Sequence, residues 1–365
     1  MNKKIKIIIA IGGTGGHVFP GINLADHLIK SGHEVELTTD KRGYKFISKD
    51  NCLKFSLLPS ATLAKKNLFT KIYSIIFILY SVLRSILFLI KKRPTLVIGM
   101  GGYSSFPICI AAKIARIKFL IYENNLIIGK ANKILLPYAK KILVSFKDVD
   151  GVPIKYNFKI EEIGNIIKKE IIDYKHKENY KYSHKNISLL ILGGSQAAKS
   201  FAEILPNIFM DCQKKGIPLK IFQHCLPSQN HKLSSFYKNF KIDFEIFNFS
   251  NNLIEYFNKT NLAITRSGSS VLAELTNANI PFISIPLPSS ADNHQLKNAI
   301  YYKKKDYCFL IEEKEIKDKL FILIKEIYEN KNKLDKIILK QSQFSDKNVY
   351  KNIDKVLREI INEKN

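Results

Sequence analysis

Three glycine-rich segments each follow an apolar run and precede a helical pattern. They are Gly12-Gly13-Thr14-Gly15-Gly16-His17, Gly99-Met100-Gly101-Gly102-Tyr103 and Gly193-Gly194-Ser195-Gln196. Glycine at a strand-to-helix turn lets backbone N–H groups approach a phosphate or a sugar, with the helix N-terminus directed at the ligand. None of the segments matches G-x-G-x-x-G, G-x-x-x-x-G-K-[ST] or G-x-S-x-G, so hydride transfer, ATP hydrolysis and an α/β-hydrolase nucleophile are not supported.

A fourth segment, 266–274, turns from a strand into a helix through small residues. Its N–H groups and hydroxyls suit a diphosphate, and the carboxylate of Glu274 is placed to accept both hydroxyls of a ribose. The polar group Asp292-Asn293-His294-Gln295 suits the hydroxyls and amide of a sugar. His17, which closes the first glycine segment, is of a type that acts as general base near neutral pH.

The sequence gives little support for a metal site. Asp148-Val149-Asp150-Gly151 imitates the D-x-D signature of metal-dependent glycosyltransferases, but two acidic residues beside a glycine are typical of a solvated turn. The segment also lies far in the sequence from every glycine segment, and no His/Cys cluster has zinc spacing. We therefore expect neither a metal nor a cofactor.

Short apolar runs alternate with helical or loop segments in both halves of the chain, which predicts an α/β fold with two doubly wound parallel sheets. The first glycine segment should lead into a helix that begins near 19–21, and a polar stretch at 175–181 marks the connection between the halves. Lysine-rich helices are expected at 314–330 and 348–362. The predicted strands are 4–11, 34–39, 55–58, 95–98, 119–122, 141–144, 186–192, 219–224, 244–247, 262–265, 282–285 and 307–311.

The net charge of +26 invites a nucleic-acid function, but lysine, isoleucine and asparagine are abundant throughout, tryptophan is absent, and no nucleic-acid-binding signature accompanies the charge. We expect no nucleic-acid partner and a general attraction to anionic lipids. The odd number of cysteines, without a C-x-x-C pair, is typical of a reducing compartment. The apolar N-terminal run ends in glycines rather than a cleavage site, so we expect a cytoplasmic protein.

The segment 72–90 is almost wholly apolar and has basic residues at both ends. Its length would suffice to cross a bilayer, but the next predicted strand, 95–98, must join the same sheet as 4–11. A helix lying in the membrane interface is favoured over a buried core helix, and a membrane span is disfavoured. The basic rim of this helix would comprise Lys65, Lys66, Lys71, Lys91, Lys92 and Arg93.

The ordered set of motifs resembles the MurG family of membrane-associated N-acetylglucosaminyltransferases over nearly the whole chain, from Lys4 to Leu357. The motifs are 12–21, 99–103, 122–125, 164–165, 193–196, 266–274 and 292–295. The resemblance implies the GT-B fold, with two Rossmann-like domains facing a cleft. An acceptor- and membrane-binding domain would comprise 1–163, with the helix 348–362 packed back on it, and a UDP-GlcNAc-binding domain would comprise 164–347.

The resemblance also implies the reaction. N-acetylglucosamine would pass from UDP-GlcNAc to the 4-hydroxyl of the MurNAc-pentapeptide of undecaprenyl-linked lipid I, with inversion, giving lipid II for peptidoglycan synthesis. His17 is the first candidate for the base and Glu123 the second. With no metal expected, loop amides and the helix dipole at Ser269 and Ser270 would meet the leaving-group charge. The enzyme would lie peripherally on the cytoplasmic face of the inner membrane, with cell-wall synthesis proteins as potential partners.

The donor site implied by the resemblance comprises several segments. Thr14, Gly15, Gly16 and Asn125 would lie near the sugar and the reaction centre, Ser195 on the donor phosphates, and the backbone of Ser250 on the uracil edge. Lys168 stands where the family has arginine, and Tyr122, Asn124 and His294 also depart from the family pattern. The remaining donor-binding residues are Ser269, Ser270, Val271, Leu272, Ala273, Glu274 and Gln295.

Three alternatives remain open at this stage. A glycolipid synthase that glycosylates diacylglycerol would share the fold and the first glycine segment, but 99–103 and 123–125 argue against it. A UDP-GlcNAc 2-epimerase would use the same scaffold and donor. A non-enzymatic membrane-anchoring partner is disfavoured because both halves are present.

Overall fold

A computed structural model describes residues 4–47, 53–60, 67–174, 186–248, 250 and 252–362. The chain forms two compact units, which are described separately. Unit 1 comprises Met1–Lys168 and Asp346–Asn365, and unit 2 comprises Lys169–Ser345. The polar stretch 175–181, Lys65 and Lys66 lie outside the described residues.

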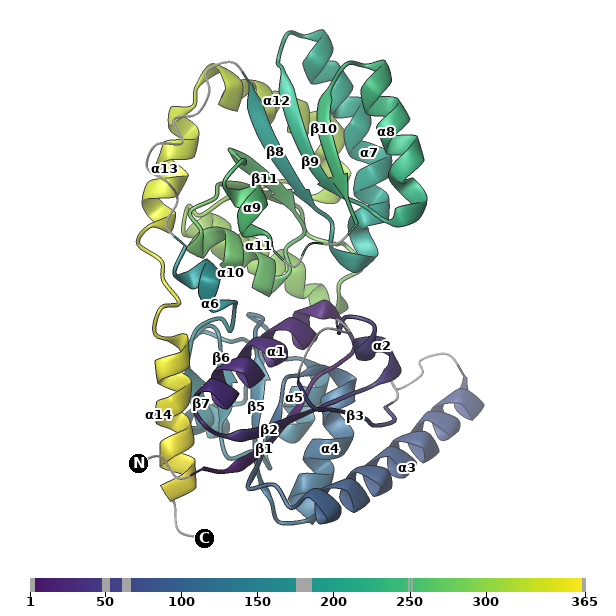
Figure 1. Cartoon of the computed structure of the whole chain (residues 1–365), viewed down its shortest axis with the longest axis vertical. Helices are drawn as coiled ribbons and strands as arrows, with labels where there is room; N and C mark the ends of the chain where they lie inside the picture. The colour runs from purple at the N-terminus through teal and green to yellow at the C-terminus, as the bar shows by residue number, and fades with distance from the viewer. Residues whose placement is uncertain are drawn as a thin grey trace. The chain divides into compact units, whose positions relative to one another are not determined.

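Unit 1 is built on a seven-stranded parallel sheet of order β3-β2-β1-β4-β5-β6-β7 (Figure 1). The first strand lies in its interior, where it pairs with β2 on one side and β4 on the other. Its isoleucines are fully buried because helices cover both faces of such a sheet. The strands are β1 Lys6–Ala10, β2 Glu34–Thr39, β3 Phe55–Leu57, β4 Leu96–Gly99, β5 Lys118–Glu123, β6 Ile142–Val144 and β7 Ile160–Glu162.

The helices of unit 1 connect these strands in the doubly wound manner predicted. The first helix begins at Gly15, several residues before the predicted start near 19–21, with Thr14 in extended conformation as its N-cap. The predicted start was wrong by several residues, since Pro20 and Gly21 lie inside the helix. The helices are α1 Gly15–Lys30, α2 Lys41–Tyr44, α3 Leu68–Lys92, α4 Gly102–Ile114, α5 Lys130–Leu135 and α14 Val349–Asn362, with the 3-10 turn η1 Ile154–Lys159.

The C-terminal helix α14 belongs to unit 1, although it follows unit 2 in the sequence. Asp346, just before it, accepts a hydrogen bond from the backbone N–H of Asn165 at 2.9 Å, and Tyr350 donates to the carbonyl of Ile167 at 2.7 Å. Gly164 is required there, because its φ is +93° and an added Cβ would lie 2.6 Å from Asp346 Oδ1. Unit 1 therefore includes 164–168, which the sequence analysis assigned to the second domain.

Unit 2 contains a six-stranded parallel sheet of order β10-β9-β8-β11-β12-β13. A large apolar core lies against it, including Phe201 and Phe209 of α7 and Tyr237 of α8. The strands are β8 Ile187–Leu192, β9 Leu219–His224, β10 Asp243–Phe247, β11 Leu262–Thr265, β12 Phe282–Ser284 and β13 Phe309–Leu310. The helices are α6 Lys169–Ile172, α7 Gly194–Lys214, α8 Asn230–Asn239, α9 Ile254–Phe257, α10 Ser269–Asn277, α11 His294–Lys304, α12 Ile316–Glu329 and α13 Asn332–Gln341.

Strand β7 and helix α13 are among the elements that were not predicted from the sequence. Strand β7 has the sequence Ile-Glu-Glu at the edge of its sheet, so it lacks the apolar run by which buried strands are identified. Helix α13 lies in a lysine-rich stretch, where its few buried residues, Leu334, Ile337 and Gln341, give a weak apolar pattern. Strand β13 is also shorter than the predicted 307–311.

Candidate active site

The first two glycine segments meet at the edge of the unit 1 sheet where the parallel strands end. The first follows β1, the second follows β4, and these strands are neighbours. Carboxyl ends of parallel strands lie at one edge, where ligands of such sheets bind. Gly12 and Gly13 have φ of +148° and +82°, and an added Cβ at Gly13 would meet nothing within 4 Å.

The imidazole of His17 packs directly on the second glycine segment. An added Cβ at Gly101 would lie 3.1 Å from His17 Cε1, and one at Gly102 would lie 3.1 Å from His17 Cδ2. Both glycines also have positive φ, +90° and +73°, which a larger residue would adopt only with strain. His17 itself is half-buried in the first turn of α1. The second segment thus needs glycine to make room for this ring.

The carboxylate of Glu123 at the end of β5 holds the segment that follows it. Its Oε1 accepts from the backbone N–H of Asn125 at 3.1 Å and from Asn125 Nδ2 at 3.0 Å. Its Oε2 accepts from the N–H of Gly129 at 2.8 Å and from Asn132 Nδ2 at 3.1 Å. With 3% of its surface exposed, Glu123 is occupied on both oxygens and fixes the position of Asn125.

Asn124 connects this segment to the first glycine segment. Its Nδ2 donates to the carbonyl of Gly16 at 3.0 Å, and its Oδ1 accepts from Asn125 Nδ2 at 2.9 Å. Proline has no N–H, so Pro20 cannot give Gly16 the hydrogen bond that a regular helix would supply four residues on. Asn124 supplies that bond instead. Gly16, next to His17, is therefore connected through Asn124 to Asn125.

Tyr122, a departure from the family pattern, is accommodated by polar partners. Its hydroxyl lies 2.9 Å from Ser145 Oγ and accepts from the backbone N–H of Ile166 at 3.2 Å. Burial raises the pKa of this hydroxyl, so it stays protonated at any physiological pH. Tyr122 thus ties β5 to the segment 164–168, whose last residue, Lys168, is half-buried in unit 1.

In unit 2, the turn between β11 and α10 is fixed by side chains from the neighbouring strand and from α11. The Oε1 of Gln295 accepts from the backbone N–H groups of Ser267 at 3.2 Å and Leu287 at 2.9 Å. Ser267 Oγ lies 2.7 Å from Ser284 Oγ, and Asn298 Nδ2 donates to the Ser267 carbonyl at 3.2 Å. Gln295 therefore uses its oxygen to hold the turn, which leaves Nε2 as the group suited to a ligand.

Helix α10 begins at Ser269 directly after this turn. Its N-cap is Gly268, which has no side chain to accept from the first N–H groups. Ser269 is buried and Ser270 half-buried, and Glu274 lies within the same short helix with its side chain partly exposed. The N–H groups and the helix dipole at this end favour a negatively charged ligand. The turn from strand to helix agrees with the sequence, and the donor-binding role of Ser269–Glu274, including Val271, Leu272 and Ala273, stays a prediction.

Arg266, just before the turn, was not assigned a role from the sequence. This residue is 4% exposed, and its guanidinium lies 4.4 Å from the centre of the Phe201 ring and donates to Ser200 Oγ at 2.6 Å. It also pairs with the carboxylate of Glu313. Arg266 therefore joins the turn to α7, the helix that follows the third glycine segment. The side chain of Ser195 lies outside the described part of the chain.

The segment 292–295 enters α11 through two left-handed residues, Asp292 with φ +51° and Asn293 with φ +55°. Such conformations are uncommon outside glycine and concentrate at functional sites, although Asn and Asp tolerate them best. The Nδ1 of His294 donates to the carbonyl of Ala291 at 2.8 Å.

Ser250, expected at the uracil edge, lies before α9. Its hydroxyl accepts a hydrogen bond from the backbone N–H of Asn252 at 3.1 Å.

Among the described residues, no group of three or more His, Cys, Asp or Glu side chains is arranged to hold a metal ion. Asp148 and Asp150 point to solvent on either side of the buried Val149. The backbone of Asp150 pairs with Leu126 and Ile128, as expected of a structural turn.

A charged group after β2 was not predicted from the sequence. Asp40 and Arg42 follow that strand at the same sheet edge as the first two glycine segments. The available signal was their position, since charged residues immediately after an interior parallel strand lie where ligands bind.

Comparison with known proteins identifies relatives of both halves. The models of the glycosyltransferase family 28 N-terminal and C-terminal domains match residues 7–144 and 188–355. A UDP-N-acetylglucosamine--N-acetylmuramyl-(pentapeptide) pyrophosphoryl-undecaprenol N-acetylglucosamine transferase of Pelagibacter ubique is 36% identical, with both chains covered completely. The transferase of the same name from Rickettsia felis is 37% identical over 87% of this chain and 91% of its own.

Solved structures agree with the fold. MurG of Acinetobacter baumannii superposes with a TM-score of 0.78 at 21% identity, covering 98% of this chain and 100% of its own. A UDP-N-acetylglucosamine 2-epimerase superposes with a TM-score of 0.64 at 13% identity, covering 99% and 98%. Structural likeness at such identities shows the fold alone, because one scaffold hosts different reactions.

Proposed function

The chain belongs to glycosyltransferase family 28 and, within it, to the MurG-type N-acetylglucosaminyltransferases, and from this membership we infer its reaction. It is a UDP-GlcNAc-dependent glycosyltransferase of peptidoglycan synthesis. We propose that it transfers N-acetylglucosamine to the 4-hydroxyl of the N-acetylmuramyl-(pentapeptide) pyrophosphoryl-undecaprenol acceptor, lipid I, in a single inverting displacement. The observation that carries this proposal is the 36% identity to the Pelagibacter ubique transferase over the full length of both chains.

Unit 2 is proposed to bind the donor. The N-terminus of α10 would receive the diphosphate at Ser269 and Ser270, and Glu274 would accept the hydroxyls of the ribose. The Nε2 of Gln295 would contact the sugar, because its Oε1 is engaged with the turn. As UDP departs, its charge would be met by these amides and the helix dipole.

His17 is proposed as the base that removes the proton from the acceptor hydroxyl. It lies half-buried on the second glycine segment, at the sheet edge of unit 1, and imidazole accepts a proton near neutral pH. Glu123 fits this role less well, because four hydrogen bonds already occupy its two oxygens. We assign Glu123 to positioning Asn125, which would contact the transferred sugar.

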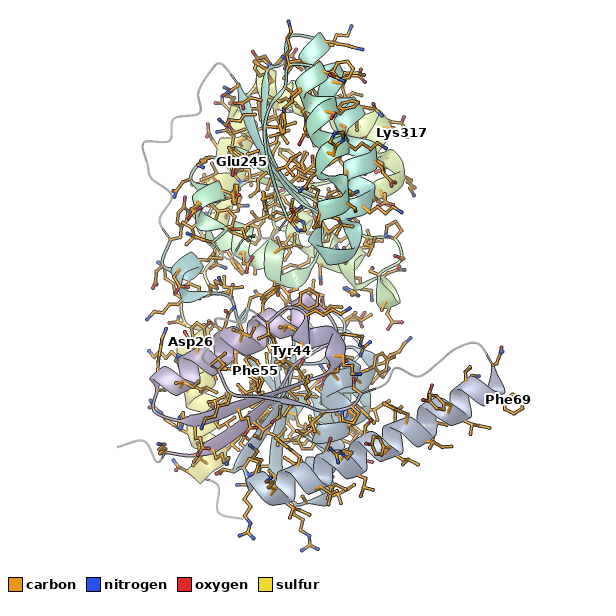
Figure 2. All side chains as sticks on the ribbon, turned by 45° about the vertical axis from the view of Figure 1, so that its right-hand side comes forward. Asp26, Tyr44, Phe55, Phe69, Glu245 and Lys317 are labelled. Atoms are coloured by element: carbon orange, nitrogen blue, oxygen red, sulfur yellow. The ribbon has the colours of Figure 1, made fainter. Side chains whose placement is uncertain are left out.

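Helix α3 is proposed to hold the enzyme on the cytoplasmic face of the membrane as a peripheral protein. Among the described residues, this helix is long and apolar enough to cross a bilayer, judged by length and composition. Only 28% of its most apolar stretch is buried. The helix packs against α4 and its small residues Ser81 and Ser85 are buried, whereas Phe69 near its N-terminal end is 86% exposed (Figure 2). The other exposed apolar residues are Ile72, Tyr73, Ile75, Ile76, Leu79, Tyr80, Leu83, Leu87 and Ile90.

A position in the membrane interface fits the topology better than a span. Strand β3 precedes α3 and strand β4 follows it, and both belong to one sheet. The chain must therefore be on the same side of the membrane before and after α3. Lys71, Arg84 and Lys91 are exposed on the helix and suit anionic headgroups. Lys92, expected in the basic rim, instead pairs with the buried carboxylate of Glu36 at 2.7 Å.

Replacing Lys71, Arg84 and Lys91 by glutamine should reduce pelleting with anionic vesicles, and 0.5 M salt should reduce wild-type pelleting in the same direction. Lys304→Gln, which removes an exposed lysine of unit 2, is the control. Wild-type protein that shows no more binding to anionic vesicles than to neutral ones would contradict the electrostatic part of the proposal.

The reaction is tested by measuring UDP release from UDP-GlcNAc with and without a lipid I analogue. We expect release that depends on the acceptor, with formation of a disaccharide product. UDP and N-acetylmannosamine accumulating without acceptor would instead identify an epimerase, whose fold this chain shares. Equal transfer to diacylglycerol would identify a glycolipid synthase.

A further inference from the structure

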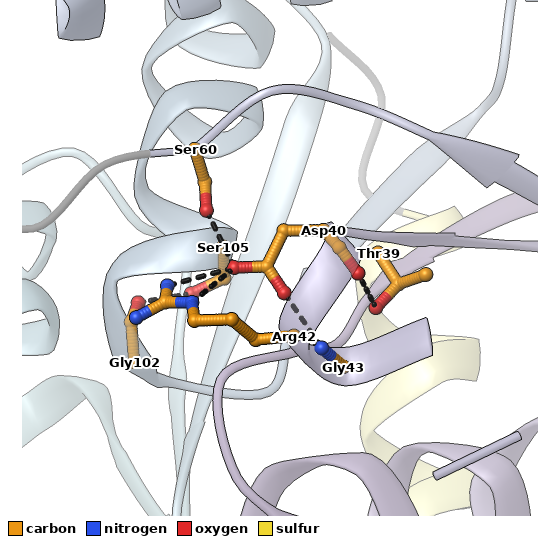
Figure 3. Close-up of polar contacts among 7 residues, drawn as sticks. All are labelled: Thr39, Asp40, Arg42, Gly43, Ser60, Gly102 and Ser105. Carbon is orange, nitrogen blue, oxygen red and sulfur yellow. Dashed lines mark hydrogen bonds and ion pairs between the residues drawn. The ribbon is translucent and has the colours of Figure 1, made fainter. Parts of the chain in front are cut away.

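Asp40 carries a buried carboxylate immediately after β2, and its hydrogen-bond donors are Arg42, Gly43 and Ser60 (Figure 3). Its Oδ1 accepts from the backbone N–H of Gly43 at 2.8 Å. Its Oδ2 accepts from Ser60 Oγ at 2.7 Å and from two nitrogens of Arg42, Nε at 2.9 Å and Nη2 at 2.7 Å. This carboxylate therefore fixes both the start of α2 and the direction of the Arg42 guanidinium.

Arg42 differs from an ordinary structural ion-pair partner because part of its guanidinium makes no hydrogen bond to the described residues. Its side chain is 49% exposed, whereas that of Asp40 is 6% exposed. A guanidinium has five N–H donors in a rigid fork, and the described residues offer no partner to Nη1. Pairs with one exposed member add little to stability, so the arrangement serves better to orient a cation than to hold the fold.

This cation stands beside the first glycine segment. An added Cβ at Gly43 would lie 2.7 Å from Gly12 Cα, and one at Gly12 would lie 3.2 Å from Asp40 Oδ1 and 2.5 Å from Ser104 Oγ. The turn of Arg42 thus packs on Gly12 with no room for a side chain between them. Ser104 belongs to the helix whose first residue, Gly102, packs on His17. Arg42 and His17 therefore both lie beside one tightly packed pair of glycine segments.

We propose that Arg42, oriented by Asp40, binds the diphosphate of the acceptor during the transfer reaction. This inference rests on the proposed function, and it adds a binding residue in unit 1 that acts on the acceptor and not on the donor. In a glycosyl diphosphate whose 4-hydroxyl reacts, the diphosphate and the reacting oxygen are attached at opposite ends of one sugar ring. A base and a cation beside the same glycine segments would meet these two groups, and a guanidinium is the side chain that best recognises phosphate oxygens.

The test compares two acceptors in steady-state kinetics with the full chain: the sugar-peptide as a diphosphate and the same sugar-peptide as an uncharged alkyl glycoside. Arg42→Gln should raise KM for the diphosphate acceptor by about tenfold to hundredfold, the effect of losing a charge-assisted hydrogen bond. KM for the uncharged acceptor and for UDP-GlcNAc should stay within about twofold. Lys41→Gln, which removes the neighbouring exposed charge, controls for general electrostatics and should change none of them.

Two more variants separate binding from a structural role. Arg42→Lys should recover part of the lost affinity, because it keeps the charge but not the fork. Asp40→Asn should raise KM for the diphosphate acceptor alone, because Arg42 loses its fixed direction. A loss of equal size on both acceptors, or none on the diphosphate, would overturn the proposal. Wild-type protein that transfers to neither acceptor would instead overturn the proposed function.

Discussion

Replacing Glu123 by glutamine tests whether this carboxylate positions Asn125 or removes the substrate proton. Each of its oxygens accepts two hydrogen bonds, so an amide in its place must turn its NH₂ group toward two donors. Gly129 and Asn132 donate on one side and half-buried Asn125 on the other. Because Asn125 has more access to water, we expect the amide to face it and to release it.

The cost follows from the number of donors left without an acceptor. An unsatisfied buried donor costs about 1–3 kcal/mol, and the two donors of Asn125 can partly turn to water, so Glu123→Gln should lower the free energy of unfolding by about 2 kcal/mol. Urea denaturation measures this change. In pH-rate profiles, kcat of the variant should be lower than that of wild type at every pH. The ionisation that controls the wild-type profile should still appear in the profile of the variant. Unchanged stability together with loss of that titration would refute this reasoning and make Glu123 the base.

Three further predictions concern single side chains. Glu274→Ala should weaken UDP-GlcNAc binding by about tenfold to hundredfold, measured by calorimetry, whereas Glu203→Ala, an exposed control, should not; unchanged affinity would remove Glu274 from the donor site. His17→Ala should lower kcat by about 10²–10⁴-fold with donor affinity intact, and a change confined to acceptor KM would make His17 a binding residue. Burial works to raise the pKa of Asp40, but its hydrogen bonds outweigh burial and hold that pKa below its usual value. Its contribution to stability is therefore complete above the ordinary carboxyl pKa and is lost as pH falls through the lower folded value, so the denaturation midpoints of Asp40→Asn and wild type should converge as the pH falls below the ordinary carboxyl pKa. A constant difference at all pH values would count against this ionised carboxylate.

The sequence was sufficient to predict most of the sheet architecture, because interior strands of parallel sheets are continuous apolar runs. Strands β2, β9 and β11 begin and end as predicted. Glycine segments after strands likewise revealed where a ligand would bind, and the packing of His17 on Gly101 explains why glycine stands there. Elements whose stability comes from neighbours, such as the edge strand β7, gave no comparable pattern.

The polar details of the candidate site could not be predicted, because they depend on contacts between residues distant in the sequence. The bond from Asn124 to the carbonyl of Gly16 joins positions more than a hundred residues apart. It also explains how Pro20 fits inside α1, which local propensity alone argues against. Similarly, nothing in the local sequence indicated that Asp40 would be buried and direct Arg42.

The return of α14 to unit 1 has a consequence for biosynthesis. On the ribosome, β7 emerges long before the segment that completes its own domain, since Val349–Asn362 follows the whole of unit 2. At ~5–20 residues per second, this interval lasts on the order of ten to forty seconds. During that time the sites that will receive Val349, Ile353 and Leu357 are uncovered, and Gly164 and Asn165 lack Asp346. Unit 2 can therefore finish folding first, so the order of synthesis and the order of completion are reversed in this chain.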